Sequence, residues 1–100
     1  MVKKIEWSDQ AKFRFQEITE YLLLKWGEKV ASDFIDITES KLELLSIFPL
    51  MGAKTFKNSR VRKLLLSKHN RLFYEVKEDT IYLITIFDTR SNYNSLPIIN

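Results

Sequence analysis

Apolar side chains in the first part of the chain recur at the spacing of a helix. Four of them follow one another at intervals of four, three and four residues and so share one helix face: Ala11, Phe15, Ile18 and Leu22. Ser8 precedes this stripe as a residue type that favours the N-cap position. Gly27 follows it as a residue type that commonly ends helices. The pattern predicts a first helix that begins at Asp9 and ends before Gly27.

A second helical pattern runs from about Glu28 to Phe48. Its stripe consists of Ala31, Phe34, Ile35, Thr38, Leu42 and Leu45. Pro49 disfavours helical geometry at the residue before it and therefore ends the helix. Because the turn at Gly27 is so short, the two helices must lie antiparallel as a hairpin. Neither helix can bury its stripe alone, so both need a platform.

The second half of the chain supplies that platform as strands. Three segments carry the pattern: Arg60–Ser67, Leu72–Lys77 and Ile81–Phe87. The last is apolar on both faces, which is typical of a strand inside a sheet. Residues 2–7 predict an edge or second-from-edge strand, and residues 50–59 predict a loop. The order β-α-α-β-β-β predicts an α+β fold, with a small antiparallel sheet packed against the N-terminal helix hairpin, as one domain over residues 1–100.

Composition narrows the possible chemistry. The chain has no cysteine and one histidine, which excludes a disulfide framework, a thiolate metal site and a cysteine nucleophile. No Asp, Glu and His cluster has metal-ligand spacing, so we expect neither a metal nor another cofactor. The N-terminus lacks the apolar region of a signal peptide, and no apolar run reaches the roughly 18–20 residues that span a bilayer. We therefore expect a cytoplasmic protein without a membrane partner.

Positive charge is concentrated in one segment. The net charge is +3, yet residues 44–74 hold seven basic side chains and no acidic one: Lys54, Lys57, Arg60, Arg62, Lys63, Lys68 and Arg71. A cluster of one sign attracts phosphates or an acidic protein segment. Lys54, Lys57, Arg60, Lys63 and Lys68 are therefore candidates for binding a nucleic acid or a protein target. The alternative is a solvated face whose charges carboxylates balance in space.

Three arginines have positions suited to phosphate chemistry. Arg62 lies inside a predicted strand, Arg71 begins the next one, and Arg90 follows the most apolar strand. Adjacent antiparallel strands would bring the three guanidinium groups to one side of the sheet, where they could bind a phosphodiester and stabilise its transition state. The alternative is three separate salt bridges. Trp7 and Trp26, at the ends of elements, are interpreted as core side chains.

Several stretches together resemble the RelE/ParE toxins of type II toxin–antitoxin systems. With the β-α-α-β-β-β order, the stretches that carry the resemblance are Tyr21–Ala31, Phe48–Gly52, Val61–Leu64, Asn70–Val76 and Ile86–Asn92, and the match as a whole runs over nearly the full chain. The last two, taken as a pair, are the more specific part. The resemblance implies a sheet packed against a helix hairpin, and a partner antitoxin whose flexible segment wraps the toxin in a hetero-oligomer. It also implies two possible activities, because RelE-like members cut messenger RNA on the ribosome without a metal, whereas ParE-like members block DNA gyrase.

The resemblance assigns residues only if the chain is a ribonuclease. Arg71 and Arg90 match catalytic arginines of that branch, and Arg62 matches a catalytic lysine. The position of the second catalytic lysine holds Leu64.

The position of the family's catalytic tyrosine holds Leu96, with Tyr93 three residues earlier. His69 or Tyr93 would therefore have to act as the base that activates the ribose hydroxyl. These departures, together with the long helix hairpin, favour a toxin that binds and blocks a target such as gyrase. The alternatives are a ribosome-dependent endoribonuclease and an inactive relic of a toxin.

Overall fold

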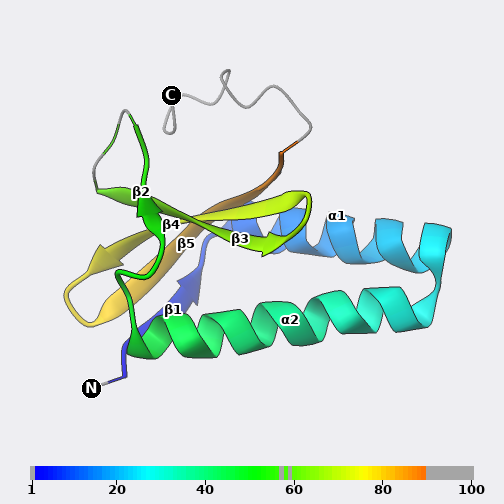
Figure 1. The fold of residues 1–100 in the computed structure, drawn as a ribbon, viewed down its shortest axis with the longest axis horizontal. Coiled ribbons are helices and arrows are strands. Elements are labelled where there is room, and N and C mark those ends of the chain that lie inside the picture. The colour runs from blue at the N-terminus through cyan, green and yellow to red at the C-terminus, as the bar shows by residue number, and fades with distance from the viewer. Residues whose placement is uncertain (1, 57, 59, 90–100) are drawn as a thin grey trace.

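The computed structural model describes residues 2–56, 58 and 60–89, and it places a helix hairpin against one face of a five-stranded sheet (Figure 1). The elements are β1 (Lys4–Trp7), α1 (Asp9–Trp26), α2 (Glu28–Ile47), β2 (Ala53–Lys54), β3 (Val61–Ser67), β4 (Asn70–Lys77) and β5 (Thr80–Asp88). The predicted order β-α-α-β-β-β is confirmed. The predicted loop over residues 50–59 contains one additional short strand, β2.

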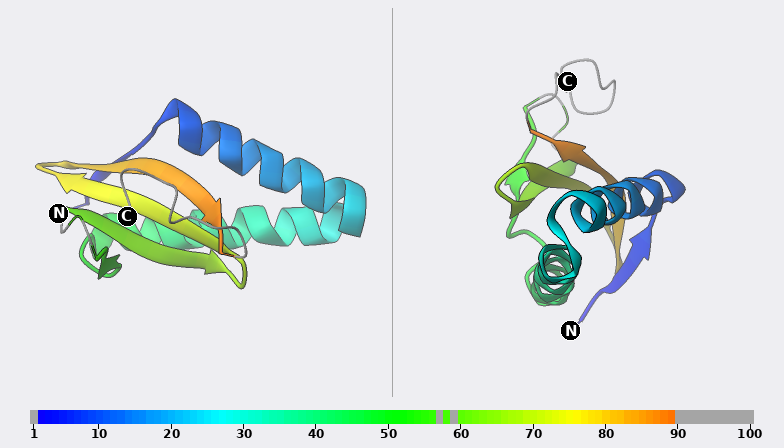
Figure 2. Two further views of the ribbon diagram at one scale, coloured as in Figure 1. Left: turned by 90° about the horizontal axis from the view of Figure 1, so that it is seen from above. Right: turned by 90° about the vertical axis from the view of Figure 1, so that its right-hand side faces the viewer.

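The helix hairpin begins and turns at the residues that the sequence predicts. The Ser8 hydroxyl accepts a hydrogen bond from the Ala11 N–H at 2.9 Å and so caps α1. It also donates to the Ile84 carbonyl at 2.7 Å, which ties the start of the helix to β5. Gly27 joins the helices with a φ of 95°, a conformation that L side chains rarely adopt. Beyond the sheet, the hairpin projects at its Gly27 end (Figure 2).

The sheet is mixed, with strand order β1-β5-β4-β3-β2. The meander of β3, β4 and β5 is antiparallel as predicted, and β1 is an edge strand as predicted. The prediction of an antiparallel sheet was wrong for β1, which pairs in parallel with β5. A parallel pair needs a long crossover connection, and here the hairpin and the meander together provide it.

Each face of the sheet carries its own apolar cluster. The larger cluster lies between sheet and helices and contains Ala11, Phe34, Leu42, Leu45, Leu66, Leu72, Tyr74, Ile81, Leu83 and Ile86. On the opposite face, Val61 and Phe73 form a second cluster with Ile84 and Phe87. Full burial of such a side chain stabilises the fold by about 1.5–3 kcal/mol. Neighbouring residues of β4 therefore point in opposite directions, Tyr74 toward the helices and Phe73 away from them.

Candidate functional site

A groove of about 840 Å³ lies between the tip of the helix hairpin and the turn that joins β3 to β4. Its walls come from α1, α2, the turn around His69, and the end of β5. Apolar side chains line most of it, namely Ile18, Tyr21, Leu22, Trp26, Val30, Phe34, Ile37, Ile86 and Phe87. A long groove with apolar lining suits an amphipathic peptide segment better than a small polar ligand.

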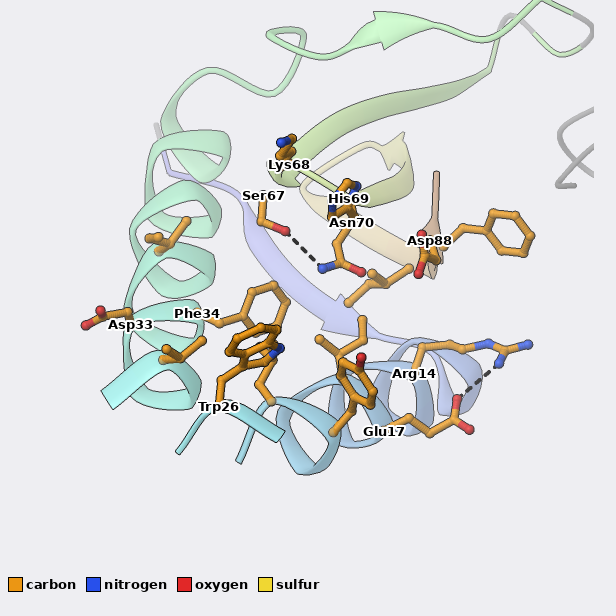
Figure 3. Close-up of a pocket in the computed structure, with 17 residues that line it drawn as sticks. Arg14, Glu17, Trp26, Asp33, Phe34, Ser67, Lys68, His69, Asn70 and Asp88 are labelled. Atoms are coloured by element: carbon orange, nitrogen blue, oxygen red, sulfur yellow. Dashed lines mark hydrogen bonds and ion pairs between the residues drawn. The ribbon is translucent and has the colours of Figure 1, made fainter. Parts of the chain in front are cut away.

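Phe34, which lines the groove, belongs to an aromatic cluster in the core. The Phe34 ring stacks on Phe15 with a centroid distance of 5.6 Å, and Phe15 contacts Trp7 at 5.3 Å. Trp7 is thus a core side chain, as predicted. The same prediction was wrong for Trp26, which is 62% exposed and lies at the hairpin end of the groove (Figure 3). The hairpin extends past the sheet, so no strand covers this indole.

Charged residues of both signs surround the apolar lining (Figure 3). On the α1 side, Arg14 pairs with Glu17 at 3.0 Å. Asp33 on α2 pairs with Lys29 at 3.3 Å. Lys68 and His69 stand on the sheet side, in the turn where the sequence places His69. A segment bound here would meet an apolar floor and a polar rim, as is common in protein interfaces.

Arg62 is engaged with the protein itself. One of its guanidinium nitrogens donates to the Gly52 carbonyl at 2.7 Å and to the Leu50 carbonyl at 3.3 Å. The buried Tyr74 hydroxyl holds the same segment: it accepts the Gly52 N–H at 2.9 Å and donates to the Pro49 carbonyl at 2.9 Å. Burial raises the Tyr74 pKa above 10.0, although the Gly52 hydrogen bond and the Arg62 charge oppose this shift.

Arg62 and Arg71 lie on opposite faces of the sheet, so the expectation that they share one side was wrong. Arg62 is paired across the strands with Tyr74, which faces the helices. Arg71 is paired with Leu65 and with Phe87, which belongs to the cluster on the other face. Side chains of directly paired residues project to the same face. Lys63, paired with Phe73, shares the face of Arg71.

The other basic candidates do not converge on one point. Lys54 lies on β2 and Arg60 immediately before β3, and both are exposed. Lys68 lines the groove at the other end of β3. Lys57 and Arg90 lie outside the described residues, as do Tyr93 and Leu96. The catalytic and binding roles of all these residues stay predictions.

Leu64, at the position of a catalytic lysine in the nuclease branch, packs against the core between sheet and helices. Within residues 2–56, 58 and 60–89, no group of three or more His, Cys, Asp or Glu side chains could hold a metal ion. Neither helix in this part of the chain has the length and apolar character needed to cross a membrane.

Two features of the site were not predicted from the sequence. One is the groove, whose walls depend on how far the hairpin overhangs the sheet. The sequence signal that could have indicated the groove is the pair of large aromatic residues at the hairpin tip, Tyr21 and Trp26, which are exposed in the structure. The other is the contact of Arg62 and Tyr74 with the segment around Gly52. Its signal was a glycine three residues after the helix-ending proline, together with an arginine that alternates with core leucines in the next strand.

The fold is that of small bacterial toxins. It is similar to a chromosomal ParDE toxin–antitoxin system from P. aeruginosa, with a TM-score of 0.72 and 18% identity over 87% of this chain and 96% of that chain. It is similar to the RelBE2 toxin–antitoxin complex of Mycobacterium tuberculosis, with a TM-score of 0.63 and 13% identity over 88% and 99% of the two chains. It is also similar to a mutant of the E. coli toxin RelE in the free state. The TM-score is 0.62, and the identity is 17% over 92% of this chain and 88% of that chain.

The sequence itself identifies the family. A family model for the ParE toxin of type II toxin–antitoxin systems, parDE, matches residues 5–93. This chain therefore belongs to the ParE toxin family, which confirms the resemblance to RelE/ParE toxins. A search among proteins with curated functions finds no match.

Proposed function

We propose that this toxin inhibits growth by binding and blocking a target protein, with DNA gyrase as the expected target, and that a cognate antitoxin neutralises it. The observation that carries the proposal is the placement of Arg62 and Arg71 on opposite faces of the sheet. Two arginines so placed do not bind one phosphodiester group together. Arg62 already donates to two backbone carbonyls, so its role is to hold the fold.

The groove supports an antitoxin as the partner. The matching solved structures include toxin–antitoxin complexes, and their toxins share this fold. An amphipathic antitoxin segment would place its apolar side on Phe34 and Trp26 and its polar side toward Lys68 and Glu17. Coupled folding of such a segment onto the groove would give a hetero-oligomer.

Induced expression of the chain alone, with pulse labelling of DNA and protein synthesis, tests the proposed target. We expect DNA synthesis to stop first and purified gyrase to lose its supercoiling activity. Co-expression with the antitoxin should restore growth. Earlier arrest of protein synthesis, with gyrase unaffected, would contradict the proposal. An absence of growth inhibition from a folded chain would support the inactive relic.

One observation favours the ribonuclease as a second candidate. Lys63 and Arg71 share the sheet face opposite the helices, and there they could contact one RNA strand. Primer extension on ribosome-bound messages would reveal cleavage, and the Arg71→Ala and Arg90→Ala double variant should abolish it. Unchanged cleavage in this double variant would exclude the roles assigned to both arginines.

A further inference from the structure

The segment Phe48–Phe56, which we call the anchor segment, presents large apolar side chains to solvent. Phe56 is 97% exposed and Leu50 is 63% exposed, and Phe48 and Met51 are exposed as well. The segment leaves the C-terminal end of α2 and rises along one side of the sheet through β2 (Figure 1). So many exposed apolar side chains within nine residues mark an interaction surface.

The backbone of the anchor segment is held in place although its large apolar side chains are exposed. Tyr74 and Arg62 bind four consecutive peptide units, from the Pro49 carbonyl to the Gly52 carbonyl. The Met51 N–H adds a bond to the Phe48 carbonyl at 3.1 Å. A surface fixed before binding loses little conformational entropy when a partner arrives.

Hydrogen bonds also hold described residues on either side of Phe56. The Thr55 N–H donates to the Val61 carbonyl at 2.9 Å, and the Val61 N–H donates to the Asn58 carbonyl at 3.0 Å. The Asn58 side chain accepts the Arg60 N–H at 3.1 Å. Thr55 is buried, yet its neighbour Phe56 projects into solvent. An exposed phenylalanine next to a buried, hydrogen-bonded residue is placed as an anchor residue would be.

Cations surround the apolar anchors. Lys54 lies on β2 and Arg60 at the end of the loop, and in the described part of the chain neither forms an ion pair. A hollow of about 380 Å³ beside Leu50 is bordered by Arg60, Arg62 and Glu75, and the Glu75 carboxylate lies 4.0 Å from the Lys77 ammonium group. The partner that complements this surface has an apolar pocket with carboxylates around it.

We propose that the anchor segment is the surface with which the toxin docks on its target protein, through Phe56 and Leu50 in an apolar pocket ringed by acidic residues. The inference rests on the proposed function as a target-binding toxin. Exposed side chains on a hydrogen-bonded backbone fit a pocket on a folded partner, whereas a flexible antitoxin segment fits the concave groove. The two sites lie at opposite ends of α2, whose 20 residues span about 30 Å.

The test compares two variants that each remove exposed apolar side chains. The double variant Phe56→Ser and Leu50→Ser changes the anchor segment. The matched control is Leu24→Ser on the hairpin, where the side chain is 88% exposed and is outside the lining of the groove and outside the anchor segment. Because all three side chains face solvent, thermal melting followed by circular dichroism should show both variants folded. Growth inhibition and affinity for purified DNA gyrase are then measured for each.

We expect the double variant to lose growth inhibition and to bind gyrase about tenfold more weakly or worse, while Leu24→Ser retains both properties. If the double variant inhibits growth as strongly as the wild type, the inference is wrong, whether or not the toxin binds gyrase. If the wild type is toxic without binding gyrase and the double variant is harmless, the anchor segment is still the docking surface, but the target is a protein other than gyrase. If the double variant instead loses affinity for a labelled single-stranded RNA, the partner is a nucleic acid and the docking on protein is refuted.

Discussion

The Tyr74 hydroxyl lies 2.9 Å from the Gly52 amide nitrogen and accepts its hydrogen. This bond connects the centre of β4 to the turn that follows α2, across 22 positions of sequence. The fit is close: a Cβ added to Gly52 would lie 2.6 Å from the Tyr74 hydroxyl and 2.7 Å from the Lys63 carbonyl oxygen. Only glycine allows the two segments to come this close together. The position of the exposed residues around Leu50 depends on this close contact.

Tyr74→Phe should therefore destabilise the protein although it removes a single oxygen. The Gly52 N–H and the Pro49 carbonyl would both lose their partner in a buried place. An unsatisfied buried group costs about 1–3 kcal/mol, which urea unfolding can resolve. Tyr82→Phe is the control, since in the described residues the Tyr82 ring contacts Lys77 but its hydroxyl forms no hydrogen bond. Equal stability of the two variants would contradict this role of Tyr74.

The raised pKa of Tyr74 predicts a loss of stability in alkali. Because burial raises this pKa in the folded state, the unfolded chain loses the phenolic proton first as the pH rises past about 10. The folded state then binds more protons than the unfolded state, so the free energy of unfolding falls between the two pKa values. Titration of phenolate absorbance should show one tyrosine ionising late, and Tyr74→Phe should remove that late step. A late step that persists in the variant would exclude Tyr74 as its source.

Helices, strands and caps could be predicted because each depends on neighbours in sequence. The Ser8 cap, the Gly27 turn and the end of α2 before Pro49 follow from local patterns. The arginine placement could also have been predicted from strand alternation. Arg62 alternates with Leu64 and Leu66, which face the helices, whereas Arg71 adjoins Leu72 and so faces away. The prediction that Arg62 and Arg71 share a face was wrong because it considered only that their strands are adjacent, and not which face each side chain takes.

Other features depend on contacts that no periodicity encodes. The parallel pairing of β1 with β5 is fixed by the packing of the hairpin on the sheet. The exposure of Trp26 depends on how far the hairpin overhangs the sheet. The contact between Tyr74 and Gly52 depends on the course that the chain takes after α2, which brings two residues 22 positions apart together. Sequence alone predicted the elements around the groove and the anchor segment, but not the sites that they form.

Gly27→Ala should destabilise the hairpin through backbone strain alone. No heavy atom lies within 4 Å of a Cβ added there, but the residue has a φ of 95° and a ψ of 176°. Such a conformation costs an L residue about 1–3 kcal/mol. Urea unfolding should show the free energy of unfolding lowered by this amount. D-alanine, introduced by semisynthesis, adds the same methyl group without this strain and should match the wild type. If L-alanine is also tolerated, the strain is absent and the turn conformation differs in solution.

Trp26→Ala should weaken antitoxin binding while leaving the free toxin stable. The indole is mostly exposed in the free chain, so its loss should change the free energy of unfolding by only about 0.5 kcal/mol. In the complex it would be covered by the bound segment, and an aromatic residue at an interface centre typically contributes about 2 kcal/mol or more. Calorimetric titration with the antitoxin that neutralises this chain measures the difference, and Leu24→Ala is the matched control outside the groove. If both variants bind as tightly as the wild type, the antitoxin docks elsewhere and the groove is not its site.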